Sequence, residues 1–245
     1  MLKFVLKIGL FIIVGILLNN SLNAQDLAII YDKDGYTNVR QSASLKSPII
    51  GKIKEGQVFC ISPFNDDFKN KDWFAVWFPI KPKHDIKDFI KSEDTKQDGF
   101  VHRSRITFLV DLKEIGAEQL SDDKFIFKAQ EFELSIATKA YQKKPGTLGD
   151  LAMKTDPAQW GSYGVTPRNE FKSISVKTKA GVYYFPKNAF SKLYEINLDQ
   201  THVYIGKQKE IYLAVSGADG SDSYDAIWCL KTGKLFSMTV MQTIP

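Results

Sequence analysis

Three aspartates near the C-terminal end have the spacing that comes nearest to a metal site. Asp219, Asp222 and Asp225 follow one another closely along the chain, and Ca²⁺ binds several oxygen atoms that converge from one loop. Their spacing does not match an EF-hand loop. Asp, Gly and Ser are also the residues that set the tip of a hairpin. We therefore expect a polar turn here, and no metal ion or other cofactor.

One cysteine and one histidine in the C-terminal half could in principle serve nucleophilic catalysis. Cys229, however, lies in the apolar run 227–230, whereas a reactive thiol needs an electropositive setting and an adjacent base. His84, His102 and His202 lack the spacing of zinc ligands. The chain has no G-x-S-x-G, no H-E-x-x-H and no phosphate loop. We expect the protein not to be an enzyme.

The two cysteines permit two interpretations. An exported protein could join Cys60 and Cys229 by a disulfide between two domains. Both also lie in apolar stretches, where a thiol behaves as a small hydrophobic side chain. Because disulfide geometry is demanding, the second interpretation is favoured, and the sequence leaves the pairing open.

The N-terminal part instead contains residue types that are common in binding sites. A short alternating stretch, residues 36–40, follows the turn Asp34-Gly35, and an aromatic stretch follows at 73–78. Tyr, Trp and Arg dominate the binding energy of protein interfaces, and Arg can hold a carboxylate with two parallel hydrogen bonds. The candidate ligand-binding residues are Tyr36, Asn38, Arg40, Trp73, Trp77 and His102.

Each of these residues also has a purely structural explanation. An Asn beside Asp-Gly can tie the turn with its side chain, and the stem of Arg40 can pack on the sheet surface. Strand alternation places Trp73 and Trp77 on one face of their strand, and a second domain could cover that face. For Asn38 and Arg40 the structural explanation is favoured.

The order of short motifs between residues 28 and 108 resembles the bacterial SH3 (SH3b) family. That family reads D-G-x-x-N-V-R, then I-G-x-(I/L)-x-x-G, W-x-x-V and G-(W/F)-V. The corresponding residues here are 34–40, 50–56, 73–76 and 99–101. The match covers about a third of the chain, and the stretch between Val76 and Gly99 is longer than the family usually has.

The resemblance implies a small β-barrel that binds a peptide or glycan-peptide and does not catalyse. In such a barrel Val39, Ile53, Val58 and Val76 would point inward. Residues 25–110 would form this barrel, and 111–245 would form a second domain for which no family is recognised.

The N-terminus has the pattern of a secretory signal peptide. Lys3 and Lys7 precede an apolar core over residues 8–18, and Ala24 ends a short polar segment. That core is shorter than the roughly 20 residues that span a bilayer. We expect cleavage before Gln25 and a periplasmic or secreted protein without a stable membrane anchor. Removal of the two lysines lowers the net charge from +5 to +3, which is too little to favour nucleic acid.

The C-terminal half reads mostly as strands. Apolar and polar residues alternate over 132–137, and 171–185 reads as a hairpin with its turn at Lys179-Ala180-Gly181. Strands are also expected near 203–205, 211–215, 224–230 and 235–241, with a turn at Thr232-Gly233 between the last two. Phe190, Leu193 and Tyr194 have the spacing of a short helix, for which Asn188 is a plausible N-cap. Trp160 and Trp228 are expected in the core.

The sequence thus predicts a mainly β protein, in which an SH3-like barrel precedes an antiparallel α+β domain with one short helix. Its expected function is non-catalytic binding of cell-wall peptide or of another exported protein. The alternative is an inhibitor or immunity-type protein that caps an enzyme in the same compartment.

Overall fold

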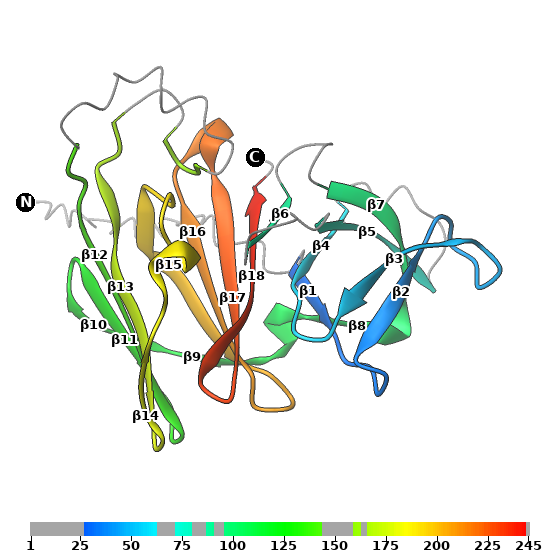
Figure 1. The fold of residues 1–245 in the computed structure, drawn as a ribbon, viewed down its shortest axis with the longest axis horizontal. Coiled ribbons are helices and arrows are strands. Elements are labelled where there is room, and N and C mark those ends of the chain that lie inside the picture. The colour runs from blue at the N-terminus through cyan, green and yellow to red at the C-terminus, as the bar shows by residue number, and fades with distance from the viewer. Residues whose placement is uncertain are drawn as a thin grey trace, which may run out of the picture.

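The chain folds into three stacked β-sheets, as Figure 1 shows. The computed structural model describes residues 27–62, 72–79, 87–90, 96–143, 159–162 and 166–243. The predicted signal peptide, 1–24, lies outside these residues, as does His84. The fold is mainly β, as predicted, and no helix in the described residues is long and apolar enough to cross a membrane.

The first sheet curves into a half-barrel (Figure 1, blue to green). Its strands run in the order β3-β2-β7-β5-β4-β1-β8. Among the described residues the edge strands β3 and β8 do not pair with each other, so the sheet stays open. The strands are β1 (Leu27–Ile30), β2 (Tyr36–Arg40), β3 (Ile49–Lys54), β4 (Phe59–Ile61), β5 (Trp73–Pro79), β7 (Lys96–His102) and β8 (Ile106–Phe108).

The second sheet, called here the middle sheet, has six strands in the order β6-β18-β17-β16-β15-β9. All neighbours are antiparallel except β6 and β18. Its strands are β6 (Lys87–Ile90), β9 (Lys113–Ile115), β15 (Ile196–Ile205), β16 (Ile211–Gly217), β17 (Tyr224–Lys231) and β18 (Lys234–Gln242).

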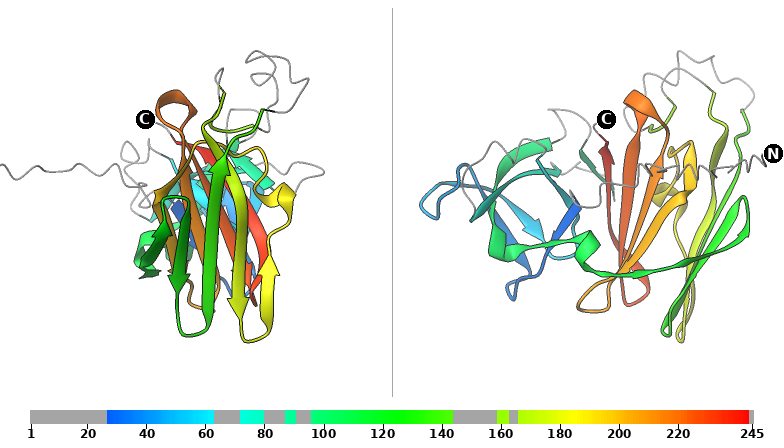
Figure 2. Two further views of the ribbon diagram at one scale, coloured as in Figure 1. Left: turned by 90° about the vertical axis from the view of Figure 1, so that its left-hand side faces the viewer. Right: turned by 180° about the vertical axis from the view of Figure 1, so that it is seen from behind.

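The third sheet, called the outer sheet, is antiparallel with the order β10-β11-β12-β13-β14. Figure 2 shows it face-on in the left view. Its strands are β10 (Ala117–Ser121), β11 (Lys124–Lys128), β12 (Phe132–Ala140), β13 (Asn169–Thr178) and β14 (Gly181–Tyr184). The alternation predicted for 132–137 is confirmed as far as Ile136, whereas Ala137 is buried; the hairpin over 171–185 is confirmed.

The middle sheet is buried on both faces because a sheet packs against each of them. On β17, Trp228 faces the core shared with the outer sheet, whereas Ile227 and Cys229 face the half-barrel. A strand covered on both faces reads as a continuous apolar run, which explains the run 226–230. Trp160 and Trp228 lie in the core as predicted, 3% and 0% exposed.

The contact between the half-barrel and the middle sheet is an apolar core of its own, called the seam. The half-barrel side contributes Leu27, Ile29, Val58, Trp77, Leu109 and Leu112. The middle sheet contributes Tyr204, Tyr212, Ala214, Ile227, Cys229 and Met241. Hydrogen bonds reinforce it, since the Thr239 hydroxyl donates to the carbonyl of Val58 at 3.0 Å. The predicted boundary near Asp111 therefore separates two parts that share a continuous apolar contact.

The long stretch between Val76 and Gly99 adds a strand to the neighbouring sheet. β6 pairs in parallel with the end of β18, with Lys87 opposite Met238 and Ile90 opposite Met241. A segment inserted between two half-barrel strands thus extends the middle sheet. This insertion gives a structural reason for the length by which the chain departs from the SH3b pattern.

Two expectations about the fold are wrong. No α-helix forms around Phe190: the only helical turn there is the 3-10 turn Lys187–Ala189, which begins after Pro186 and not at Asn188. The structure buries Phe190, Leu193 and Tyr194, as the predicted helix would have done. Their backbone, however, is irregular. Val39, Ile53 and Val76 do fill the half-barrel core, whereas Val58 points to the seam.

Candidate functional site

Strand pairing places the predicted ligand-binding residues on one face of the half-barrel. Phe100 on β7 lies opposite Arg40 on β2 and opposite Ala75 on β5, and Trp73 lies opposite His102. Directly paired residues point to the same side of a sheet. Since Val39 and Val76 point into the half-barrel core, their strand neighbours point outward. The outer surface of β3, β2, β7 and the start of β5 is called the recognition face.

Tyr36 is the most open aromatic side chain of this face, with 37% of its surface exposed. The ammonium of Lys52 lies 3.9 Å from the centroid of its ring. Such a cation–π contact contributes about 0.5–1 kcal/mol at an exposed site. It holds the ring against β3, so Tyr36 presents a defined surface instead of a freely rotating one.

Arg40 is positioned by the loop that joins β2 to β3. Its guanidinium donates a hydrogen bond to the carbonyl oxygen of Ser47 at 2.7 Å. The hydroxyl of Ser47 in turn accepts the backbone N–H of Ser42 at 2.9 Å. A guanidinium has five N–H donors, and the bond to Ser47 uses one nitrogen. The guanidinium of Arg40 is therefore held in place by the loop and has N–H donors besides the one that Ser47 accepts.

Asn38 does not tie the turn, contrary to the structural explanation favoured above. It lies in the middle of β2, and its side-chain oxygen is buried without a hydrogen-bond partner among the described residues. A buried acceptor that lacks a donor costs about 1–3 kcal/mol. A hydrogen bond donated to this oxygen by an N–H group of a ligand, or by the O–H of a water molecule, would offset this cost.

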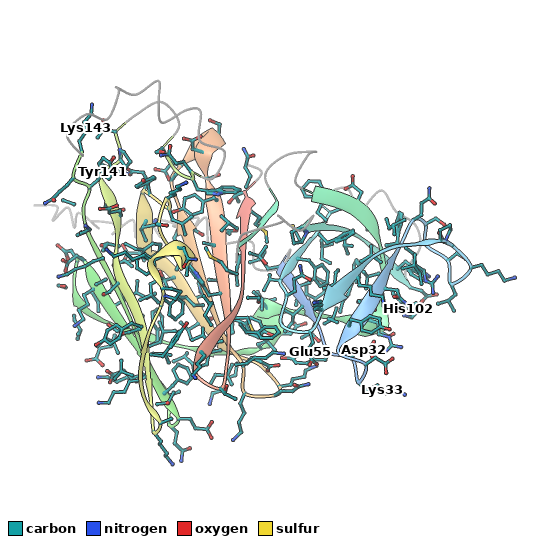
Figure 3. All side chains as sticks on the ribbon, viewed as in Figure 1. Asp32, Lys33, Glu55, His102, Tyr141 and Lys143 are labelled. Atoms are coloured by element: carbon teal, nitrogen blue, oxygen red, sulfur yellow. The ribbon has the colours of Figure 1, made fainter. Side chains whose placement is uncertain are left out.

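Trp73 and His102 form an edge-to-face pair at the far end of the recognition face. Their ring centroids lie 5.3 Å apart at an interplanar angle of 85°. The backbone N–H of Ser104 donates to Nδ1 of His102 at 3.3 Å, which fixes the imidazole. Trp73 is only 7% exposed, so its buried ring forms a fixed surface against which the imidazole of His102 packs. Figure 3 shows His102 on the half-barrel, away from the middle sheet.

Trp77 does not belong to the exposed part of this face. It is 8% exposed and packs in the seam against the middle sheet. The tryptophan therefore follows the competing explanation, in which a second part of the protein covers it. The other five predicted residues remain together on the recognition face, although Trp73 is as buried there as Trp77 is in the seam.

The sequence interpretation missed Phe100 and Lys52, which also belong to the recognition face. Phe100 is half-buried between Arg40 and Ala75, and Lys52 lies opposite Asn38. The alternation Gly99-Phe100-Val101 could have indicated that Phe100 points outward. Only the register of β2, β7 and β5 shows which residues it meets.

The recognition face carries a positive charge. Arg40, Lys52 and Lys54 all point outward from β2 and β3, and no acidic residue occurs between residues 35 and 54. Asp98 lies on the same side of β7, opposite Trp77 at the covered end. The open end of the face therefore favours anionic groups, above all carboxylates.

The other chemical groups considered from the sequence do not come together. Nδ1 of His202 lies 2.6 Å from a carboxylate oxygen of Glu114, within hydrogen-bond distance, and not beside Cys229. Cys229 is fully buried in the seam, Cys60 is half-buried at its border, and no disulfide joins them. Burial raises the pKa of the Cys229 thiol to about 12, which keeps it protonated.

The three aspartates do not converge either. Asp225 points inward and accepts a hydrogen bond from Ser216 at 2.7 Å, whereas Asp219 and Asp222 lie at the 3-10 turn Gly220–Asp222. No group of three His, Cys, Asp or Glu side chains within the described residues could hold a metal ion.

Asp225 makes the stability of the protein depend on pH. Burial raises its pKa from 3.8 to about 6, and the Ser216 hydroxyl and the charge of His202 oppose this shift. The folded state therefore holds a proton that the unfolded chain releases, so stability falls as the pH rises from about 4 to 6. We expect Asp225→Asn, whose amide oxygen can still accept from Ser216, to be more stable than the wild type at pH 7 by on the order of 2 kcal/mol.

Urea denaturation of both proteins at pH 4 and pH 7 checks this prediction. The difference between them should be small at pH 4, where Asp225 is protonated. An equal difference at the two pH values would contradict the raised pKa.

A polar cavity of about 410 Å³ lies between the outer and middle sheets. Arg168 and Glu195 form an ion pair of 2.6 Å in its wall. Asp122, Asp199 and Asp219 also line it. The carboxylate of Glu195 is thereby bound within the protein, and the site gathers no catalytic set.

No family model matches the chain, and neither a curated protein nor a solved structure matches it.

Proposed function

We propose that the protein is an exported, non-catalytic binding protein whose SH3b-like half-barrel recognises the carboxylate groups of cell-wall peptides. The observation that carries the proposal is the register, because it aligns Tyr36, Asn38, Arg40 and His102 on one cationic face. The motif resemblance at 34–40 and 99–101 supports a wall ligand, and the signal-like N-terminus supports export.

The side chains of the recognition face suit a short peptide with a free carboxylate. Arg40 offers a planar fork that matches the two carboxylate oxygens, and Lys52 and Lys54 add charge beside it. Tyr36 and Phe100 supply apolar surface for the aliphatic part of the ligand. The oxygen of Asn38 can accept an amide N–H after a rotation of its side chain.

Binding of this kind needs no covalent step. The ligand exchanges hydrating water for the donors of the recognition face, and the rigid sheet keeps those donors in place. Because Trp73 and the Ser47 loop already hold His102 and Arg40, little side-chain entropy is lost on binding.

Co-sedimentation of the exported protein with purified peptidoglycan tests the proposal. Tyr36→Ala and Arg40→Lys should each weaken binding by about tenfold, as expected for the loss of an interface anchor or of a bidentate contact. The urea midpoint, measured in parallel, should stay within the range usual for surface substitutions.

Tyr184→Ala is the matched control, since Tyr184 is 69% exposed on the outer sheet. This variant should bind peptidoglycan as the wild type does. Failure of the wild type to co-sediment would refute the wall-peptide proposal, and equal losses in all three variants would refute this location of the site.

A further inference from the structure

A groove lies between the outer and middle sheets, outside the recognition face. It has a volume of about 310 Å³ and lies where β14 faces the start of β18. It is called the edge groove and is lined by Tyr183, Pro186, Asn188, Leu235, Phe236 and Ser237. None of these residues belongs to the recognition face, so the inference does not rest on the function proposed above.

Both strands beside the edge groove have unpaired edges. In the described chain β14 pairs only with β13, so its other edge is open over Gly181–Tyr184. β6 pairs with β18 only from Met238 to Met241, so in the described chain residues 234–237 have no strand partner on that side, although the hydroxyl of Ser237 donates to the carbonyl of Gly56. An unpaired strand edge presents N–H and C=O groups that another strand can bind.

Apolar side chains surround this edge in an exposed position. Val182 and Tyr184 on β14 are 51% and 69% exposed, and Phe236 on β18 is 52% exposed. A bulge explains Phe236: Leu230 pairs with Leu235 and Cys229 with Ser237, so Phe236 is the additional residue. Bulges redirect side chains in this way and are frequent next to functional sites.

The two chain segments that line the edge groove carry lysines and no acidic residue. Residues 171–194 contain five lysines and no acidic residue, and residues 226–243 contain two lysines and no acidic residue. Lys231 lies 3.8 Å from Glu55 and is partly neutralised; Figure 3 shows Glu55 where the half-barrel meets the middle sheet. Lys179, Lys187 and Lys234 are exposed, and no ion pair within the described residues involves them.

We propose that the edge groove docks an extended acidic segment of a partner protein, which adds to β14 as a further strand. The backbone of that segment would satisfy the open edge of β14, and its alternate side chains would pack against Phe236 and Tyr183 or against Val182 and Tyr184. Its carboxylates would pair with Lys179, Lys187 and Lys234. An anionic lipid could use the same lysines, but it has no backbone to pair with the strand edge.

Fluorescence anisotropy with a labelled eight-residue peptide that alternates Glu with Val or Tyr tests the inference on the full mature chain. We expect saturable binding that the double variant Lys187→Glu/Lys234→Glu weakens by about tenfold. Phe236→Ala should weaken it by a similar factor. The control Lys46→Glu reverses an exposed charge on the half-barrel loop and should leave binding unchanged.

Two further probes distinguish the partner class. A peptide with the same sequence but N-methylated on the residues that would pair with β14 should not bind, because it lacks the edge hydrogen bonds. Equal binding of the methylated peptide, or of a peptide with Lys in place of Glu, would overturn the inference. So would the absence of saturable peptide binding, including a result in which only vesicles with anionic lipid bind.

Discussion

Val76→Asp should unfold the half-barrel or reduce its unfolding free energy by several kcal/mol. Val76 is completely buried on β5, where it lies between Ile61 on β4 and Gly99 on β7. The neighbouring side chains of that core are apolar, so a carboxylate there would be without an ion-pair partner. A buried unpaired charge is among the most destabilising changes that a single substitution can make.

Chemical denaturation measured by tryptophan fluorescence checks this effect. Val182→Asp is the matched control, because Val182 is about half exposed on the edge strand β14; it should change the midpoint little. A Val76→Asp protein with the midpoint of the wild type would show that Val76 is not a core residue.

Trp77→Ala should cost about 3–5 kcal/mol, the usual range for removal of a large buried aromatic side chain. Trp77 is 8% exposed and packs across the seam with Tyr212, Ile227 and other residues of the middle sheet. Its loss would leave a cavity between two parts that are also joined by hydrogen bonds, in which the hydroxyls of Ser237 and Thr239 donate to the backbone carbonyls of Gly56 and Val58.

The number of unfolding transitions shows whether the half-barrel and the other two sheets unfold as a single cooperative unit. We expect one transition in the wild type, because the seam joins them through a continuous apolar core. Tyr184→Ala removes an exposed aromatic side chain and should cost little. A cost for Trp77→Ala as small as that of Tyr184→Ala would contradict a stabilising seam.

The local strands were predictable because their signals are short-range. Alternation at 132–136, the turn at 179–181 and the hairpin through Thr232-Gly233 all appear where the sequence places them. Thr232 and Gly233 both have positive φ angles, 51° and 73°, as the two-residue turn of such a hairpin requires.

The predicted helix was wrong because the spacing of Phe190, Leu193 and Tyr194 reflects burial and not a helical backbone. Pro186 fixes the start of a 3-10 turn, and Lys192 and Glu195 then adopt positive φ values of 65° and 52°. These values interrupt any continuing helix. Apolar spacing over so few residues does not distinguish a helical face from a buried loop.

The candidate site was predictable in part. The residue types of Tyr36, Asn38 and Arg40 indicated recognition, and alternation predicted that they share a face. Whether Trp77 is exposed or buried depends on the seam, which is formed by residues that are far apart in the sequence. The same limit applies to Val58, whose apolar character fits either the half-barrel core or the seam.

The most direct test of the proposed wall-peptide site is an amide NMR titration of residues 25–245 with a cell-wall stem peptide that has a free carboxylate. We predict saturable shifts in residues 36–40, 52–54 and 100–102, which together form the recognition face, and none along β14. The absence of shifts at millimolar peptide, or shifts confined to residues outside that face, would contradict it.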